Sequence, residues 1–251
     1  MNAFIITGAS RGLGNAIAKR LVDKNNYLFC ISRNLDENLV AYAEEKQCRL
    51  EFLEFDLSNV YEIEKVMDAI FDKLNLEEIK SIGLINNAGT VSPIKPIDDC
   101  EGKEIITNLH VNLLAPIILT SSFTRNLKSF EGHKRVINIS SGAGKKPFYG
   151  WSNYCASKAG IDLFTQCVGV EQNRSDNPVK IISLGPSIMD TKMQEEIRKT
   201  AKEDFQQVER FIDFKKNGDL LSADYVAEKV IKLFWDEEFI QGGVINVRDL
   251  D

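Results

Sequence analysis

Tyr154 and Lys158 have the residue types and the spacing of an acid–base pair. Residues four apart share one face of a helix, so the Lys158 ammonium can lie beneath the Tyr154 phenol. A positive charge there favours the phenolate and lowers the phenol pKa from about 10 towards the range useful near neutrality. Tyr42, Tyr61 and Tyr225 also precede a lysine by four residues, so spacing alone does not identify the functional pair.

A glycine-rich turn near the N-terminus has the composition of a phosphate-binding loop. Gly8, Gly12 and Gly14 follow a short apolar run at residues 4–6 and open a segment with helical periodicity. Missing side chains let backbone N–H groups and the helix N-terminus approach a pyrophosphate. A glycine turn without a ligand is the alternative, and the position directly after the first strand favours binding.

The residues at the end of the second apolar run indicate which nicotinamide cofactor is bound. In the common dinucleotide fingerprint an acid about 20 residues after the turn holds the ribose 2′-hydroxyl. This chain offers Ser32 and Arg33, with no carboxylate before Asp36, and Arg11 projects from the glycine turn. Either arginine alone could be a surface charge, but two guanidinium groups suit a 2′-phosphate. The pair predicts NADP(H).

Short apolar runs alternate with segments of helical periodicity along the chain. This alternation predicts an α/β fold, a single-domain Rossmann-type doubly wound parallel sheet of about seven strands, spanning residues 1–251. The expected strands lie at residues 4–6, 27–31, 50–55, 81–85, 135–139, 180–184 and 243–247.

Two expected helices carry more apolar residues than one sheet face can bury. They span about 102–127, where Pro116 should bend the helix or mark a break, and 151–172. We therefore expect a homodimer built on these helices. Residues 192–217 are dense in charge and are expected to form a solvated helical flap, with closure over a substrate as the alternative.

Composition argues against several classes of function. A net charge of −6 provides no overall basic field, so a nucleic-acid partner is not expected. Five cysteines without a CxxC motif and only two histidines indicate neither a disulfide framework nor a metal site. The chain shows no charged leader and no apolar stretch judged long enough to span a bilayer, so we expect a cytoplasmic protein with no membrane partner.

Together these motifs resemble the classical short-chain dehydrogenase/reductases. The glycine turn, the run at residues 86–89, Asn112, a serine pair and Tyr154 with Lys158 occur in the order and spacing of that family, over nearly the whole chain. Ser141 rather than Ser140 precedes Tyr154 by the interval that the family uses. Residues 150–158 and 189–194 are similar to the sepiapterin reductase and benzil reductase branch.

The resemblance implies roles for individual residues. Tyr154 would protonate a carbonyl oxygen as hydride arrives from the nicotinamide, and Ser141 would hydrogen-bond the same oxygen. Lys158 would hold the nicotinamide ribose and lower the phenol pKa, while Asn112 would support a water near Lys158. The expected cofactor-binding residues are Gly8, Ser10, Arg11, Gly12, Leu13, Gly14, Ser32, Arg33, Asp56, Leu57, Asn86, Asn87, Ala88, Gly89, Tyr154, Lys158, Pro186, Ile188 and Thr191.

The expected substrate is a small-molecule carbonyl compound, namely a bulky aromatic ketone or a vicinal dicarbonyl such as benzil. An apolar, adaptable lining suits flat aromatic faces. The alternatives are a 3-oxoacyl-thioester reductase and a non-catalytic NADPH-binding sensor, and Phe148 and Trp151 could instead pack in the core or dimer interface. The expected substrate-lining residues are Ser141, Phe148, Trp151, Tyr154, Met189 and Met193.

Two positions depart from the pattern of the family. Ser187 follows Pro186 where the family usually has glycine, which leaves the geometry of the turn beside the nicotinamide open. Sepiapterin reductases anchor the pterin with an acid in the closing-strand region. This chain has Asn246 there and Asp249 close by, so acceptance of a pterin is also open.

Overall fold

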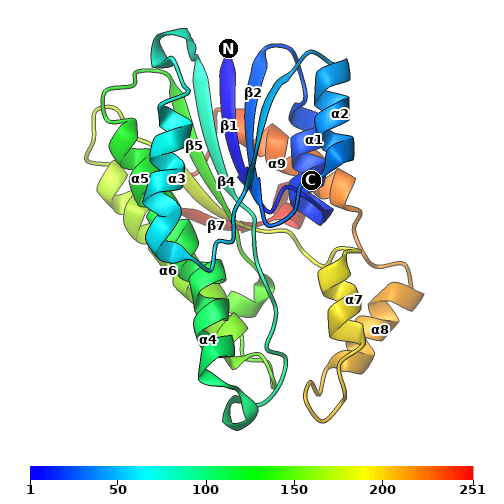
Figure 1. Cartoon of the computed structure of the whole chain (residues 1–251). Helices are drawn as coiled ribbons and strands as arrows, with labels where there is room; N and C mark the ends of the chain where they lie inside the picture. Colours follow the sequence, from blue (N-terminus) through cyan, green and yellow to red (C-terminus); the bar gives the residue numbers. More distant parts are fainter. Residues whose placement is uncertain (251) are drawn as a thin grey trace.

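Seven parallel strands form one sheet in the order β3-β2-β1-β4-β5-β6-β7 (Figure 1). The computed structural model describes residues 1–250. Each expected strand is present and ends within two residues of its expected limits, which confirms the predicted α/β fold. The strands span Asn2–Thr7 (β1), Asn26–Ser32 (β2), Arg49–Glu54 (β3), Ser81–Asn86 (β4), His133–Ile139 (β5), Lys180–Gly185 (β6) and Gly243–Asn246 (β7).

Helices cover both faces of the sheet, which is why the central strands are apolar without interruption. Phe4 and Ile6 of β1 pack into the core on one face, and Ala3 and Ile5 pack into the core on the other. The first face carries α1 (Gly12–Leu21), α2 (Glu37–Glu45) and α9 (Ala223–Trp235); the second carries α3 (Ile63–Phe71), α5 (Ala115–Asn126) and α6 (Ser152–Gln172).

Short helical turns complete the fold. They are η1 (Val60–Glu62), η2 (Leu76–Glu78), η3 (Ile97–Asp99), η5 (Gly142–Gly144) and η6 (Val247–Leu250).

The long apolar segment after β4 is interrupted, as Pro116 predicts. It runs as α4 (Gly102–Leu109), a π-helical segment η4 (His110–Leu114) and α5, with Pro116 in the first turn of α5. Pro116 has no N–H to donate to the carbonyl four residues earlier, at Asn112, so the regular ladder breaks there. Single π-helical turns of this kind are frequent at functional sites.

The combined segment Gly102–Asn126 is long and apolar enough to cross a membrane by length and composition. The expectation that no stretch reaches this length was therefore wrong. One such helix is weak evidence for a membrane span, because core helices pass the same test, and α5 packs against the sheet through Leu119 and Phe123.

Residues 192–217 form α7 (Lys192–Arg198) and α8 (Val208–Lys216), which lie beyond the carboxyl ends of the strands (Figure 1). This segment is not the fully solvated flap that its charge suggests. Phe205, Val208 and Phe211 are buried in a small core that also contains Trp151 and Tyr154. The few aromatic residues of the segment, rather than its many charges, therefore fix how it packs against Trp151 and Tyr154.

Candidate active site

A groove of about 330 Å³ lies across the carboxyl ends of the strands, where the order reverses between β1 and β4. Ligands of open α/β sheets bind at such a switch point. Most of the residues expected from the sequence meet there. Its walls include Gly8, Ser10, Arg11, Gly12, Leu13, Ser32, Arg33, Asp56, Leu57, Asn87, Ala88, Gly89, Tyr154, Lys158, Pro186, Met189, Thr191 and Met193.

Three residues of the expected cofactor set lie outside the wall of the groove. Asn86 is buried and donates to Asn138 Oδ1 at 2.8 Å, so it joins strands instead of facing a ligand. Gly14 serves close packing, since a Cβ there would lie 2.3 Å from the carbonyl oxygen of Gly8. The carbonyl of Ile188 accepts a hydrogen bond from the backbone N–H of Leu221 at 2.9 Å.

Sequence reasoning missed several residues of the groove wall. They are Ile31, Asn34, Phe55, Thr90, Thr107, Val111, Ile139, Ser140 and Lys192. Ile31, Phe55 and Ile139 end apolar runs that were assigned to strands, and the carboxyl end of a parallel strand is a signal that could have found them.

The glycine turn has the shape needed to accept a phosphate group. Gly8 and Gly12 adopt φ values of +68° and +57°, which side chains rarely allow. A Cβ on Gly8 would lie 2.9 Å from Asn87 Nδ2, so the turn needs glycine to meet the loop after β4. Thr7 Oγ1 fixes that loop by accepting hydrogen bonds from the backbone N–H groups of Asn87 and Ala88 at 2.9 and 3.0 Å. A dinucleotide pyrophosphate fits this cradle.

Two exposed guanidinium groups line the groove, one at the glycine turn and one directly after β2. Arg11 and Arg33 form no ion pair with any of residues 1–250. The first acidic residue after Arg33 is Asp36, and its carboxylate already has hydrogen-bond partners. It caps the N-terminus of α2 and accepts a hydrogen bond from Asn15 Nδ2 at 2.5 Å. The groove therefore presents two guanidinium groups without an ion-pair partner among residues 1–250, while local donors hold the Asp36 carboxylate.

Tyr154 and Lys158 meet on α6 as their spacing predicts. Lys158 Nζ lies 5.8 Å from the centroid of the Tyr154 ring and donates to the Ile139 carbonyl at 2.9 Å. The Tyr42–Lys46 pair has nearly the same separation, 5.6 Å, but Tyr42 is exposed on α2. Burial in the groove, and not the four-residue interval, distinguishes Tyr154.

The pKa values of this pair differ from the sequence-based expectation. Burial raises the pKa of Tyr154 above its usual 10, although a hydrogen bond with Ser141 opposes the rise. Burial also lowers the pKa of Lys158 to about 8, with Asp162 opposing the fall. The expected lowering of the phenol pKa was wrong for the protein by itself, because desolvation of the buried phenol outweighs the hydrogen bond with Ser141.

Ser141 and Asn112 lie outside the wall of the groove and hold loops beside it. Ser141 Oγ accepts from the backbone N–H of Ala143 at 3.1 Å, which shapes η5. Asn112 accepts from the Thr90 N–H at 2.8 Å and donates to the Thr90 carbonyl at 2.7 Å. The Asn112 side chain thus fixes the loop beside Gly89 instead of offering a free group to a water.

The two aromatic residues expected on the substrate wall lie in the neighbouring core. Trp151 is 4% exposed and stacks on Phe205, with ring centroids 4.5 Å apart. Phe148 is half-buried and lies 5.2 Å from Trp151 between ring centroids. These contacts match the alternative of core packing, because Trp151 anchors the α7–α8 segment.

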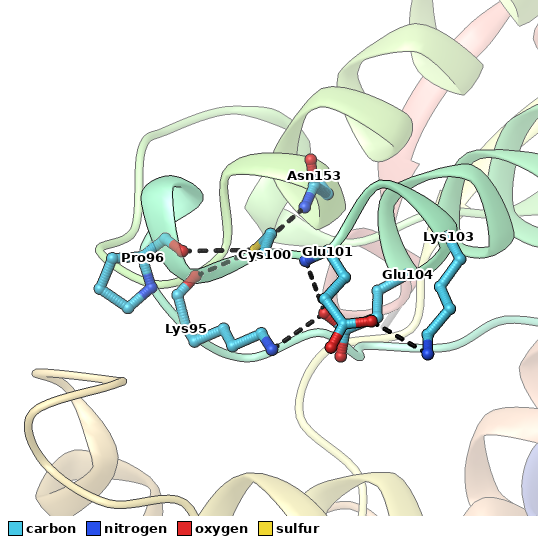
Figure 2. A network of polar contacts seen from close by, with 7 residues as sticks. All are labelled: Lys95, Pro96, Cys100, Glu101, Lys103, Glu104 and Asn153. Atoms are coloured by element: carbon cyan, nitrogen blue, oxygen red, sulfur yellow. Dashed lines mark hydrogen bonds and ion pairs between the residues drawn. The ribbon is translucent and has the colours of Figure 1, made fainter.

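The loop between β4 and α4 braces the start of α6 (Figure 2). The Lys95 N–H donates to the Gly150 carbonyl at 3.0 Å, and Cys100 Sγ accepts from Asn153 Nδ2 at 3.7 Å. An ion pair of 2.9 Å between Lys95 and Glu104 ties the loop to α4. These contacts fix the helical turn that carries Tyr154.

The closing strand offers no carboxylate aimed at the groove. Asp249 Oδ2 accepts from the backbone N–H of Asn246 at 2.9 Å, and Asn246 Oδ1 accepts from the N–H of Arg248 at 3.0 Å. Both side chains are engaged in their own turn, so neither Asp249 nor Asn246 is free to anchor a pterin.

Comparison with known proteins agrees with this geometry. The family model described as short chain dehydrogenase matches residues 2–202. A benzil reductase ((S)-benzoin forming) of Bacillus cereus is 47% identical over 98% of this chain and 99% of its own length. A sepiapterin reductase of Bos taurus is 30% identical over 98% of this chain and 94% of its own length.

Solved structures share the fold. The KRED1-Pglu enzyme has a TM-score of 0.83 at 25% identity and covers 97% of this chain and 100% of its own. A short chain dehydrogenases/reductase of Saccharomyces cerevisiae has a TM-score of 0.85 at 24% identity and covers 99% of this chain and 97% of its own.

The chain belongs to the short-chain dehydrogenase family, and its sequence lies in the branch that contains benzil and sepiapterin reductases. It is an oxidoreductase that acts on carbonyl or CH–OH groups with a nicotinamide cofactor.

Proposed function

We propose that the protein is an NADPH-dependent carbonyl reductase that converts an aromatic vicinal diketone of the benzil type into a chiral hydroxyketone. The observation that carries the proposal is the buried pair of Tyr154 and Lys158, with Ser141 hydrogen-bonded to the phenol, at the wall of a dinucleotide groove. The name of the Bacillus cereus relative supports the substrate class.

Tyr154 has the properties of a proton donor in the reductive direction. Its raised pKa keeps the phenol protonated at neutral pH, ready to protonate the carbonyl oxygen as negative charge develops there. When bound, the reduced nicotinamide supplies the hydride that reaches the carbonyl carbon, and it leaves oxidised. Ser141 orients the same oxygen, and the Tyr154 phenolate regains its proton from solvent.

The remaining residues of the groove hold and orient the cofactor. The turn at Gly8 and Gly12 would hold the pyrophosphate, Asp56 and Leu57 would flank the adenine, and Lys158 would bind the nicotinamide ribose. These assignments extend the family resemblance to side chains that line the groove.

NADP(H) is proposed over NAD(H) from the two arginines. Arg11 and Arg33 face the groove without an internal ion pair, and Asp36 is held by the α2 cap and Asn15. A 2′-phosphate would satisfy both guanidinium groups, whereas a free 2′-hydroxyl would leave them unmatched.

The substrate region is apolar and adaptable. Met189 and Met193 line the groove, as do Thr107 of α4 and Val111 of η4. In a vicinal diketone each carbonyl withdraws electrons from the other, so the first hydride addition is easier than the second. A 3-oxoacyl thioester would also reach Tyr154, but an acidic carrier needs a basic entrance, and Arg11 and Arg33 of the groove are assigned to the 2′-phosphate.

We further propose a cytoplasmic homodimer formed through α4, α5 and α6. Leu163 and Val170 of α6 are exposed although they are large and apolar, and so are Ile106 and Leu114 of the neighbouring segment. Apolar side chains concentrated on two adjacent helices are typical of a self-complementary interface.

The proposal is tested with benzil and NADPH, followed by chiral chromatography of the benzoin. We expect one enantiomer in clear excess, little further reduction, and slower turnover of acetoacetyl thioesters. Racemic benzoin, or faster turnover of the thioester than of the diketone, would contradict the proposed substrate.

A further inference from the structure

Asp162 is the only buried acidic residue among residues 1–250, and nothing in the proposed reaction uses it. A buried carboxylate is costly unless it is hydrogen-bonded and balanced by charge. It lies on α6 four residues after Lys158, so the two side chains share one face of the helix. The interior beside the groove thus contains one cation and one anion.

Hydrogen bonding and packing fix the position of Asp162. Ser183 Oγ, on β6, donates to Asp162 Oδ1 at 2.6 Å within the core. The backbone of Gly144 packs against the other carboxylate oxygen, Asp162 Oδ2. Gly144 is the last residue of η5, the short helical turn that begins directly after Ser141. A Cβ at Gly144 would lie 2.9 Å from Asp162 Oδ2 and 2.8 Å from the Lys158 carbonyl carbon. Asp162 therefore sits where α6, β6 and the loop carrying Ser141 meet.

Lys158 forms no direct ion pair with any of residues 1–250, and Asp162 is the carboxylate whose charge acts on its ammonium. Its ammonium bonds to the Ile139 carbonyl of β5, and Ser140 Oγ contacts its backbone carbonyl. The π-helical segment packed against α6 presents Asn112, which contacts Ser157 Oγ at 3.4 Å, and the loop after β4 presents Gly89. Because these contacts are neutral, they cannot balance the charge of a buried ammonium.

Other titratable groups near this region do not replace Asp162. On α6 itself they are Tyr154 and Cys155, and the loop after η5 carries the exposed Lys145 and Lys146. The π-helical segment carries His110, whose ring is hydrogen-bonded to the Ser58 carbonyl. The groove wall carries Arg11, Arg33, Asp56 and Lys192.

We propose that Asp162 is a positioning residue whose buried negative charge keeps Lys158 protonated, and that Ser183 fixes the Asp162 carboxylate for this role. The inference rests on the proposed function, since it assigns Lys158 to the cofactor ribose and to Tyr154. Asp162 is buried outside the wall of the groove and acts only through Lys158.

The sign of the expected pH effect follows from charge. Burial pulls the Lys158 pKa down to about 8, and Asp162 is the group that opposes this fall. Removing the carboxylate lowers the Lys158 pKa further, so the ammonium is lost at a lower pH. The activity that depends on the ammonium is present below this pKa and declines as pH rises through it. The alkaline limb of the pH profile should therefore move to lower pH.

The test compares pH profiles of kcat/KM for wild type and Asp162→Asn with any carbonyl substrate that turns over. Asn keeps an acceptor for Ser183 and nearly the same shape. We expect the alkaline limb to move down by about one pH unit. The loss should then be about tenfold at high pH and small at pH 6.5. NADPH affinity, measured by fluorescence, should weaken over the same pH range without any substrate.

Matched controls separate charge from structure. Glu171→Gln removes an exposed carboxylate from the same helix and should leave the limb in place. Ser183→Ala keeps the Asp162 charge and should move the limb much less than Asp162→Asn. A second variant, Asp162→Ser, removes the same charge with a smaller side chain and should reproduce the displacement.

The proposal is overturned if both Asp162 variants lower kcat/KM equally at all pH values, or if the pH dependence of NADPH binding is unchanged. The binding measurement needs no carbonyl compound. Failure with benzil would therefore count against the proposed substrate and leave the assignment of Asp162 intact.

Discussion

Lys158 lies beneath Tyr154 on α6, with its ammonium 5.8 Å from the centroid of the phenol ring. The helix sets this separation, since the exposed Tyr42–Lys46 pair shows 5.6 Å. What the fold adds is burial and the 2.9 Å hydrogen bond to the Ile139 carbonyl at the end of β5. A common helical pair thereby becomes a desolvated pair at the wall of a groove, where its electrostatic effects are larger.

Cofactor preference should respond to the charge of Arg33. Arg33→Asp places a carboxylate against the 2′-phosphate, and we expect the ratio of kcat/KM for NADPH to that for NADH to fall by about 100-fold. Steady-state kinetics with both cofactors measure this ratio. Arg174→Asp, at an exposed arginine beyond the end of α6, is the control and should leave it unchanged. An unaltered ratio in Arg33→Asp would exclude the proposed phosphate contact.

The turn after Pro186 is expected to be strained. Ser187 adopts φ +62°, the left-handed conformation that favours glycine, at the position where the family usually has glycine. Ser187→Gly should raise the free energy of unfolding by about 1 kcal/mol, as measured by denaturant titration. Gln47, with φ +56° at the end of α2, is a matched site, and Gln47→Gly should have a similar effect. A destabilised Ser187→Gly protein would show that the serine side chain makes a compensating contact.

Docking of the α7–α8 segment should depend on Phe205, which is fully buried against Trp151. Phe205→Leu weakens this stack, so we expect a higher KM for the carbonyl substrate, faster proteolysis within residues 192–217 and unchanged NADPH affinity. Phe123→Leu, at an equally buried phenylalanine of α5, should lower global stability without selective cleavage in that segment. Equal proteolysis patterns for the two variants would argue against an anchoring role.

The proposed dimer should dissociate when a charge enters its apolar face. Leu163 is 62% exposed on α6, and Leu163→Asp would force a carboxylate into the interface. Sedimentation velocity should then show a monomer at micromolar concentration, where wild type remains a dimer. Leu35→Asp, at an exposed leucine before α2, should leave the dimer intact. Wild-type protein that sediments as a monomer would refute the assembly.

The sequence predicted the strands well because buried parallel strands are apolar on both faces. It also placed most of the groove, since the carboxyl ends of such strands converge. It failed where the direction of a side chain matters. Asn86 ends β4 but points inward to Asn138, and Trp151 looks like a substrate contact but packs on Phe205. Spacing also could not predict the Tyr154 pKa, because desolvation depends on the whole fold.

The most direct test of the central claim is the rate of carbonyl reduction by Tyr154→Phe. Only the proton donor is lost, so kcat should fall by at least about 1,000-fold while NADPH binding, measured by fluorescence, stays within about twofold of wild type. Tyr42→Phe, at a tyrosine with the same lysine spacing, should retain full activity. A Tyr154→Phe enzyme with more than about a tenth of wild-type turnover would contradict the assignment of Tyr154 as the proton donor.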